Sequence, residues 1–300
     1  MMLNVNCSRI RTCLIPLVIV GLLATCGSGS SGKGAANPTK PTSTSRPTAT
    51  RPLRILLTND DGYDAPGIDV VAQALEALPD IELTIVAPAT NKSGTGSQNT
   101  PGTLTASNQK TASGLPATAV DGFPADAVRY GLDTVMTSVP DVVVAGINQG
   151  QNLGPITQIS GTVGAAKAAA AREIPAIAAS QGLGVSLQYE VGARLVVSWI
   201  TEHRVAFITA TETGNANLVG VVNLNIPTCA TGSLRGVKNV PLATDGTGAT
   251  VNGDCSSTVT DVTTDIAAFL NGFASVTQLD AAGAAATPTT TFPPLEASGA

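Results

Sequence analysis

The chain has 300 residues, of which 43% are hydrophobic, 12% charged and 3% aromatic, with a net charge of −5 and a pI of about 4.8. This length allows one large domain or two small ones, and the apolar share is enough for a real core. The acidic balance, without any basic run, excludes binding to nucleic-acid polymers, and a small anionic substrate would need a metal ion or backbone amides to offset its charge.

Residues 1–26 have the pattern of an export signal. Two arginines precede an apolar run, 14–24, that is too short to span a bilayer and has the length of a signal-peptide core. The run ends before Cys26 in a way that resembles a bacterial lipoprotein signal, in which this cysteine is lipidated and begins the mature chain. Thr25 departs from that pattern, because glycine, alanine or serine is usual there. The alternatives are an ordinary cleaved secretory signal and a retained anchor.

Two stretches lack the residues of a core. Residues 27–50 contain only small, polar, basic and proline residues, and we expect a flexible linker. Residues 281–300 are rich in alanine, threonine and proline, which predicts a disordered tail. The domain is therefore predicted at 51–280. With the signal, this arrangement predicts an exported, extracytoplasmic domain that is tethered to the cell membrane through its N-terminal lipid.

Export also decides how the cysteines are interpreted. Cys7 and Cys13 leave with the signal, and Cys26 carries the lipid. Cys229 and Cys255 remain in an oxidising compartment, where two remaining cysteines favour a disulfide. The alternative is a pair of free thiols.

The segments that follow alternate between strand and helix. Strands are predicted at 54–58, 82–87, 141–147, 175–179, 219–226 and 273–278, and helices at 67–78, 124–136, 160–172, 188–201 and 262–271. The strand at 141–147 is apolar throughout, as is typical of a strand buried on both faces. Residues 228–261 are rich in threonine, glycine and aspartate and predict a loop region that could hold a hairpin. The alternation predicts an α/β fold, with a mostly parallel sheet between two helical layers.

Polar residues follow several of these strands. Asn59, Asp60, Asp61 and Gly62 end the first strand abruptly, and adjacent carboxylates repel each other unless a hard cation offsets the repulsion. Parallel strands place such ends at one edge of the sheet. We therefore expect three loops and one helix start to meet there, at 59–62, 91–94, 146–154 and 160–164.

The donor atoms in these segments are oxygens. Carboxylate, amide and hydroxyl oxygens suit Mg²⁺, Mn²⁺ or Ca²⁺, whereas the single histidine, His203, and the scattered cysteines do not favour a zinc site. Each segment alone has a simpler interpretation. The Asp60 segment is turn chemistry, Ser160 to Thr162 is typical of a helix cap, and Lys92 of a solvated loop lysine.

Order and spacing together are more specific. The segments 57–68, 86–94, 140–154 and 160–166 resemble, in this order, the SurE family of 5′/3′-nucleotidases. Further matches to the family lie at 122–128, 223–227, 264–268 and 272–277, so the resemblance covers residues 53–279.

The resemblance implies a Rossmann-like α/β domain and a divalent-metal-dependent phosphomonoesterase. It places the metal, with one cation per subunit, on the two adjacent aspartates, a loop serine and an asparagine, here Asp60, Asp61, Ser93 and Asn148. It places the substrate phosphate on Asn152, Ser160, Gly161 and Thr162. Asp60 and Asp61 are also the expected catalytic residues, with Asp60 orienting or deprotonating the water. Ile159 stands where the family usually has tyrosine, so any contact from that tyrosine is lost.

Assembly is where the chain departs from the family. The family carries a long extension between the segments that match here at 223–227 and 264–268, and this extension swaps between subunits. The span 228–262 is short compared with this extension, and the tail replaces the closing helix of the family. The subunit contacts of the family are therefore not expected in full, and a homodimer is one possible assembly. A disulfide between Cys229 and Cys255 would brace the shortened segment.

The expected reaction is therefore hydrolysis of a nucleoside monophosphate to nucleoside and phosphate. One alternative is a surface lipoprotein that keeps the fold and the metal and binds nucleotides without turnover. A phosphatase of the haloacid-dehalogenase type is disfavoured, because it needs Asp-x-Asp spacing and the carboxylates here are adjacent.

Overall fold

The structure is a computed structural model that describes residues 51–288. The predicted signal peptide, the lipidation site at Cys26, the linker at 27–50 and residues 289–300 lie outside the described residues.

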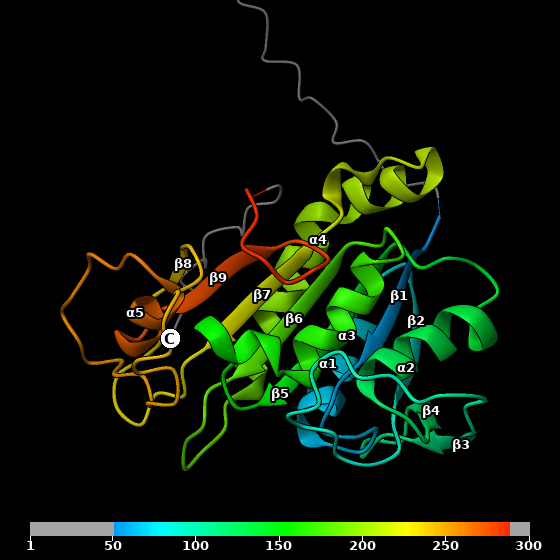
Figure 1. Ribbon diagram of the computed structural model, residues 1–300, viewed down its shortest axis with the longest axis horizontal. Helices are drawn as coiled ribbons and strands as arrows, with labels where there is room; N and C mark the ends of the chain where they lie inside the picture. The colour runs from blue at the N-terminus through cyan, green and yellow to red at the C-terminus, as the bar shows by residue number, and fades with distance from the viewer. Residues whose placement is uncertain (1–50, 289–300) are drawn as a thin grey trace, which may run out of the picture. The chain divides into compact units, whose positions relative to one another are not determined.

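The described part is built on a nine-stranded sheet with strand order β3-β4-β2-β1-β5-β6-β7-β9-β8 (Figure 1). The strands are β1 Leu53–Thr58, β2 Ile81–Pro88, β3 Ala106–Lys110, β4 Pro116–Val120, β5 Val142–Gln149, β6 Ala176–Gln181, β7 Val221–Ile226, β8 Val237–Asn239 and β9 Ala274–Leu279. The helices are α1 Pro66–Glu76, α2 Pro124–Tyr130, α3 Gly161–Ala170, α4 Tyr189–Thr213 and α5 Asp265–Leu270. Shorter helical turns lie at Gly131–Val135, Gly154–Gln158 and Ala216–Leu218.

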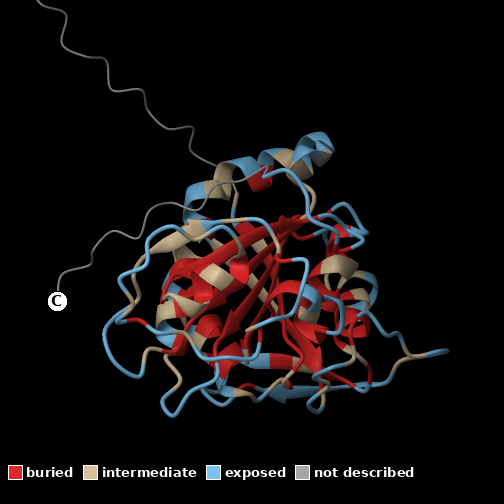
Figure 2. Ribbon diagram, turned by 60° about the vertical axis from the view of Figure 1, so that its left-hand side comes forward, coloured by how far each residue is buried: buried red, intermediate tan, exposed pale blue. Residues whose placement is uncertain are grey.

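Helices cover both faces of the sheet. α1 and α4 pack together on one face, against a core that includes Leu57 and Trp199, and α2 and α3 pack on the other, against Leu56 and Val143. The central strands are therefore buried on both sides, which Figure 2 shows as a continuous buried centre. Strands β4, β2, β1, β5, β6 and β7 run parallel, as the apolar strand sequences predict. The predicted α/β class with two helical layers is confirmed.

The chain changes direction within the sheet between β1 and β5. β1 pairs with β2 on one side and with β5 on the other. The chain runs outward from β1 through β2 to β4, and then returns to β5 and continues outward through β6 to β7. Open α/β sheets bind ligands in the crevice at such a switch point, beyond the carboxyl ends of the strands. The topology thus points to the ends of β1 and β5.

A glycine lets α1 begin against this edge. A Cβ on Gly67 would lie 1.8 Å from the carbonyl oxygen of Ile147, at the end of β5, so no larger residue fits without moving the backbone. The preceding residue, Pro66, occupies the first turn of the helix, where its missing N–H costs no hydrogen bond.

Several elements differ from the sequence prediction. Strands β3 and β4 form an antiparallel hairpin that was not predicted, because every residue of β3 is exposed and the segment carries no apolar period. α4 continues to Thr213, twelve residues beyond its predicted end at 201, because Phe207 and Ile208 extend its buried face. The strand predicted at 273–278 is β9, which runs antiparallel to β7, as a mostly parallel sheet allows.

The C-terminal part also differs. Within 228–261 no hairpin forms, and the strand found there, β8, pairs in parallel with β9. The described start of the predicted tail turns back along the sheet, where Ala285 bridges to Leu279 and the Gln158 side chain donates a hydrogen bond to the carbonyl of Gly283. Across residues 51–288, no helix combines the length and the apolarity needed to cross a bilayer.

Candidate active site

Asp60 and Asp61 lie directly after β1, at the switch point. Asp60 points toward the start of α3, where its Oδ1 accepts a hydrogen bond from the Thr162 hydroxyl at 2.6 Å. A Cβ on Gly161 would lie 2.8 Å from Asp60 Oδ2, so glycine at the first turn of α3 is what makes room for this carboxylate. The main-chain oxygen of Asp60 accepts from the N–H of Lys92 at 2.7 Å, which draws in the loop after β2.

Asp61 joins three segments of the chain. Its Oδ1 lies 3.0 Å from Asn91 Nδ2 and 3.5 Å from Ser93 Oγ, and its Oδ2 accepts from the main-chain N–H of Gln149 at 2.9 Å. Gln149 follows Asn148, so the carboxylate sits between the loop that carries Ser93 and the end of β5. The segments that carry the predicted metal-binding residues Asp60, Asp61, Ser93 and Asn148 thus meet at this edge of the sheet, with Asp61 in contact with Ser93 and with the neighbour of Asn148.

Asn148 lies near the end of β5, one residue before Gln149, and its side chain carries an amide oxygen. Its Nδ2 donates to the carbonyl of Gly150 at 2.5 Å, which leaves Oδ1 on the other side of the amide. With the two carboxylates and the serine hydroxyl, the donor set consists of oxygens only, which suits a hard divalent cation. Among residues 51–288 no three histidine, cysteine, aspartate or glutamate side chains gather in a way that could hold a metal, so neutral oxygens would complete any coordination here.

The electrostatics of the pair agree with a cation site. Asp60 is only 2% exposed, and burial, with a smaller contribution from the charge of Asp61, raises its pKa to about 6 despite the hydrogen bond from Thr162. Burial also raises the pKa of Asp61. A divalent cation between the two carboxylates would offset both penalties.

Three of the four predicted phosphate-binding residues, Ser160, Gly161 and Thr162, form the start of α3. The Ser160 hydroxyl accepts from the N–H of Val163 at 3.1 Å and caps the helix, which confirms that this segment is a helix cap. The N–H groups of the first turn have no partner inside a helix and favour an anion. Asn152 lies instead in a buried network, because its Nδ2 donates to Ser180 Oγ at 2.8 Å. That amide nitrogen carries a second hydrogen, which the bond to Ser180 leaves for another acceptor.

Sequence reasoning did not single out three groups near the site. Asn91 and the main chain of Gln149 hold Asp61 directly, and neither residue type signals a site by itself. Tyr189 begins α4, and burial raises its pKa to about 12, with a smaller effect from the charge of Asp61. Only the folded arrangement brings these three groups to Asp61.

Lys92 and His203 have structural surroundings. The Lys92 ammonium lies 5.9 Å from the centre of the Phe123 ring. His203 hydrogen-bonds the Trp199 carbonyl through Nδ1 at 2.9 Å and lies 5.9 Å from the Phe207 ring. Both contacts of His203 lie within α4 and away from the proposed site, which is typical of a structural histidine.

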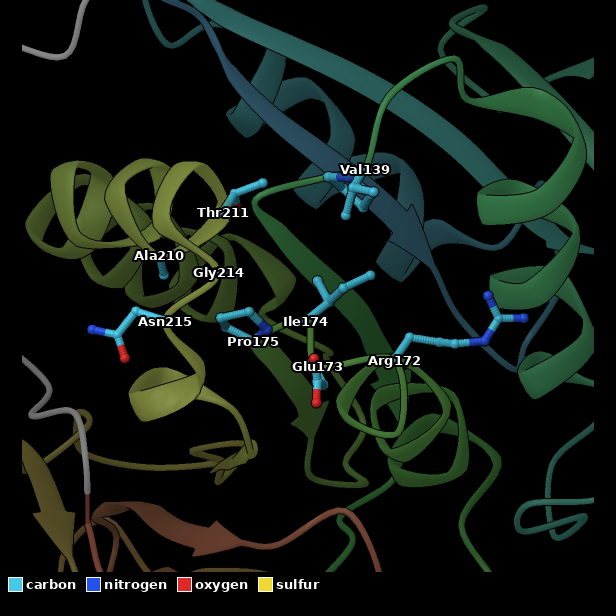
Figure 3. A pocket seen from close by; sticks show the side chains of 10 residues that line it. Val139, Arg172, Glu173, Ile174, Pro175, Ala210, Thr211, Gly214 and Asn215 are labelled. Carbon is cyan, nitrogen blue, oxygen red and sulfur yellow. The ribbon is translucent and has the colours of Figure 1, made fainter.

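A cavity of about 190 Å³ lies at the opposite edge of the sheet, near the amino ends of β5 and β6 (Figure 3). Its walls include Pro140, Pro175 and Thr211. The Arg172 guanidinium points away from Pro175 in Figure 3 and pairs with Asp133 at 3.0 Å. No carboxylate pair or hydroxyl cluster among the lining residues resembles the arrangement at Asp60, so the chemistry is placed at the carboxyl edge.

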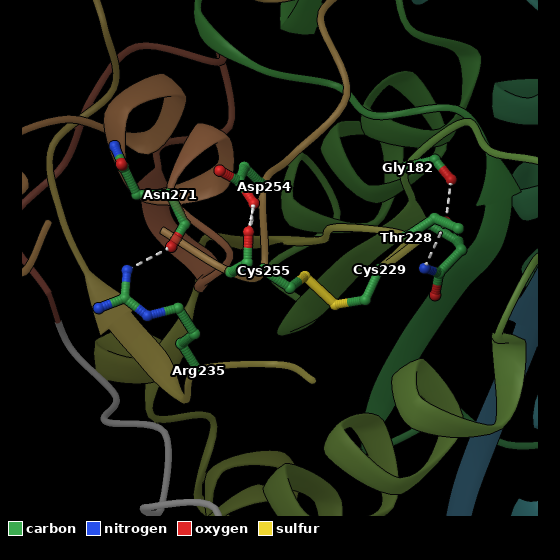
Figure 4. Close-up of a disulfide and its surroundings, with 9 residues drawn as sticks. Gly182, Thr228, Cys229, Arg235, Asp254, Cys255 and Asn271 are labelled. Carbon is green, nitrogen blue, oxygen red and sulfur yellow. Dashed lines mark hydrogen bonds between the residues drawn. A yellow bond between two sulfur atoms is a disulfide. The ribbon is translucent and has the colours of Figure 1, made fainter. Parts of the chain in front are cut away.

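The structure forms the disulfide between Cys229 and Cys255, with a Cα–Cα distance of 5.5 Å (Figure 4). The bond ties the chain just beyond β7 to the segment before α5. Next to it, Thr228 donates to the Gly182 carbonyl and accepts from Gln181 Nε2 at 2.9 Å. The loop region is therefore fastened to the carboxyl ends of β6 and β7.

Comparison with known proteins decides the family. Residues 55–248 match the family model described as "Survival protein SurE". The chain belongs to the SurE family. A solved structure, the SurE protein from Aquifex aeolicus, superposes with a TM-score of 0.59 at 29% identity and covers 76% of this chain and 93% of that one.

Curated SurE relatives carry the name 5′-nucleotidase SurE. The protein from Methanopyrus kandleri is 38% identical over 58% of this chain and 66% of its own length. Those from Carboxydothermus hydrogenoformans and Aliivibrio fischeri are 45% and 36% identical, over 43% and 63% of this chain and 50% and 68% of their own lengths. The matched part thus spans about half to two thirds of the length of these SurE proteins.

Proposed function

We propose that the chain is a divalent-metal-dependent phosphomonoesterase, a 5′/3′-nucleotidase that hydrolyses nucleoside monophosphates to nucleoside and phosphate. The observation that carries the proposal is the adjacent pair Asp60 and Asp61, held with Ser93 and the end of β5 at the switch point of the sheet. Relatives named 5′-nucleotidase support the substrate class. The oxygen-only donor set agrees with dependence on a divalent metal.

The residues at this edge fit a cation. Asp60 and Asp61 would hold it with Ser93 and Asn148, and Mg²⁺ or Mn²⁺, with Ca²⁺ as a third candidate, matches these donors. When bound, such an ion lowers the pKa of a water molecule and offsets charge on a phosphoryl oxygen. The raised pKa values of both carboxylates support this assignment, because two buried like charges need a counter-charge.

The residues of the site have separate roles in this proposal, in proton transfer and in binding the phosphoryl group. Asp60 keeps one oxygen on the Thr162 hydroxyl, and its Oδ2 is the atom that we assign to accept a proton from the attacking water. The main-chain N–H groups of Gly161 and Thr162, at the positive end of α3, hold the phosphoryl oxygens. The Ser160 hydroxyl accepts a bond from inside the helix and can donate its own hydrogen to the phosphate. Asn152 adds an amide N–H.

We also propose that the enzyme is exported and tethered by a lipid on Cys26. The disulfide supports this location, because such bonds persist in oxidising compartments and are rare in the cytosol. A homodimer remains our proposal for assembly.

The experiment is a phosphatase assay on the purified protein with p-nitrophenyl phosphate and AMP, in Mg²⁺ or Mn²⁺ and then in EDTA. Release of phosphate should require the ion and should fall by at least about a hundredfold in Asp60→Asn, the range for loss of a general base. Asp64→Asn, which changes an exposed carboxylate of the same loop, is the matched control and should keep full activity. Full turnover in Asp60→Asn would refute the assignment, and a folded wild type that binds Mn²⁺ but releases no phosphate would favour a non-catalytic binding protein.

A further inference from the structure

The side chain of Asn225, on β7, holds the main chain of Asn152. Asn225 Oδ1 accepts from the N–H of Asn152 at 2.6 Å, and Asn225 Nδ2 donates to the carbonyl of the same residue at 3.1 Å. One amide thus satisfies both main-chain groups of Asn152, as a neighbouring strand would. Asn223, two residues earlier on the same face of β7, donates to the same carbonyl at 2.9 Å.

This contact belongs to a polar row that crosses the sheet. Asn148 pairs with Ser180 between β5 and β6, Ser180 with Asn225 between β6 and β7, and Asn225 with Ser275 between β7 and β9. The row starts at a proposed metal ligand and ends three strands away. Asn152 bends back over it and is held by two of its members, Ser180 at the side chain and Asn225 at the main chain.

The burial of the row makes the contact costly to lose. Asn225 and Ser180 are fully buried, and Asn152 is 6% exposed. If Asn225 were removed, the Asn152 carbonyl would keep its bond from Asn223, but the Asn152 N–H would lose its partner in a place that water does not reach freely. A buried donor without a partner favours a rearranged backbone. The expected effect is therefore a shift of the Asn152 main chain rather than a general collapse of the sheet.

We propose that Asn225 is a positioning residue of the active site, which fixes the main chain of Asn152 so that the Asn152 amide meets the substrate phosphate. The inference rests on the proposed function, because it takes Asn152 as a phosphate ligand. Asn225 touches no substrate atom itself and acts through Asn152. Metal binding is a separate property, since Asp60 and Asp61 follow β1 and have no contact with the amide of Asn225 among the hydrogen bonds of the described residues.

The test compares Asn225→Ala with Ser275→Ala in the purified protein. Ser275 is the cross-strand partner of Asn225 and is fully buried, and its hydroxyl has no hydrogen-bond partner among residues 51–288, so its loss should change little. Loss of Asn225 should raise KM for p-nitrophenyl phosphate and the inhibition constant of inorganic phosphate about tenfold, with kcat nearly unchanged, as expected when ground-state and transition-state binding weaken equally. Affinity for Mn²⁺ should stay within about twofold of wild type, since its proposed carboxylate ligands are untouched.

Two further measurements separate positioning from plain stability. In an Asn152→Ala background, Asn225→Ala should raise KM by less than about twofold, because the side chain that it positions is already gone. Amide hydrogen exchange of the peptide that contains Asn152 should speed up in Asn225→Ala and not in Ser275→Ala. If Asn225→Ala does not fold, the nearly isosteric Asn225→Leu replaces it, since leucine fills the same space and still removes the acceptor for the Asn152 N–H, so the same rise in KM and in exchange is expected.

The outcomes distinguish the two proposals. No phosphate release by the wild type would refute the proposed function, while the exchange measurement would still report whether Asn225 holds Asn152. An active wild type in which Asn225→Ala leaves KM, phosphate inhibition and exchange unchanged would overturn the positioning role. Fully additive effects of Asn152→Ala and Asn225→Ala would overturn it as well, because they would show that Asn225 acts by another route.

Discussion

Replacing Asp60 by asparagine should stabilise the metal-free protein while it removes the activity. The Asp60 carboxyl is 2% exposed, and burial raises its pKa from 3.8 to about 6. A pKa that rises on folding by this much costs the native state on the order of 3 kcal/mol at neutral pH, because each pH unit corresponds to about 1.4 kcal/mol. Asparagine keeps the size of the side chain and an oxygen for the Thr162 hydroxyl, but carries no charge to bury.

The pH dependence has a definite sign. The native metal-free state holds a proton on Asp60 more tightly than the unfolded state does, so this carboxyl lowers stability as pH rises from about 4 to about 6. Below pH 4 the carboxyl is protonated in both states and the variant should gain nothing. At pH 7 in EDTA the variant should be more stable by up to about 3 kcal/mol, or roughly 6 to 12 °C in Tm for a domain of this size.

Urea or thermal unfolding of wild type and Asp60→Asn at pH 4, 5, 6 and 7, in EDTA and in Mn²⁺, measures this effect. Mn²⁺ should stabilise the wild type and have little effect on the variant, because a ligand that binds only the native state adds to its stability. A wild type as stable as the variant at pH 7 in EDTA, or a difference that persists at pH 4, would refute the reasoning.

Asp69→Asn is the matched control, with the opposite sign. Asp69 is 7% exposed, and burial works to raise its pKa, but hydrogen bonds from Ser113 and its neighbours outweigh burial and lower it. A lowered pKa contributes stability that is present at neutral pH and lost as the pH falls through the native pKa. Asp69→Asn should therefore destabilise the protein at pH 7, and Mn²⁺ should stabilise it as it does the wild type.

Three further changes have defined outcomes. Gly67→Ala places a methyl group 1.8 Å from a carbonyl oxygen at the end of β5, so it should destabilise the fold by several kcal/mol in urea unfolding and lower activity by moving that strand end. Replacing Cys229 and Cys255 by serine opens a loop with a sequence separation of 26 and should cost about 3 kcal/mol in the chain-entropy model, measured against the oxidised protein. Thr162→Val removes the hydrogen bond that lowers the pKa of Asp60, so Mn²⁺ titration should show about tenfold weaker binding; unchanged affinity would show that the hydroxyl does not orient this ligand.

The sequence predicts those parts of the site that lie in short local segments. Asp60 and Asp61 follow an apolar strand and precede an amphipathic helix, so their place at the sheet edge follows from the chain itself. The hydroxyl of Thr162 is different, because the residue was predicted from the resemblance as a phosphate ligand and the structure turns its side chain to Asp60. That contact joins residues 102 positions apart, and no local pattern encodes it.

The residues that support the site could not be predicted from the sequence either, because they too act through contacts between distant segments. Asn225 lies in a strand whose burial was predictable, but its contact with Asn152 depends on the register of β5, β6 and β7, which a single sequence does not determine. The β3 and β4 hairpin was missed because all residues of β3 are exposed and show no apolar period, and β4 is only five residues long with a buried face of small residues such as Ala117 and Ala119. The sequence thus predicts functional residues within short segments, but it does not predict which strands pair or in which register.

The loop region at 228–261 and the start of α5 contact the chain on both sides of Asn152. Gln151, next to Asn152, donates to the carbonyls of Ala249 and Val251 at 3.2 and 3.3 Å, and Asp265 accepts from the N–H of Gly154 at 2.7 Å. Asn225 holds the same stretch from the sheet side. The disulfide closes the segment that supplies the contacts from Ala249 and Val251, so opening it should loosen the Gln151 and Asn152 stretch on the loop side, as Asn225→Ala does on the sheet side. Reduced wild type should therefore share the raised KM of Asn225→Ala, whereas an unchanged KM in the reduced and folded protein would confine the disulfide to stability alone.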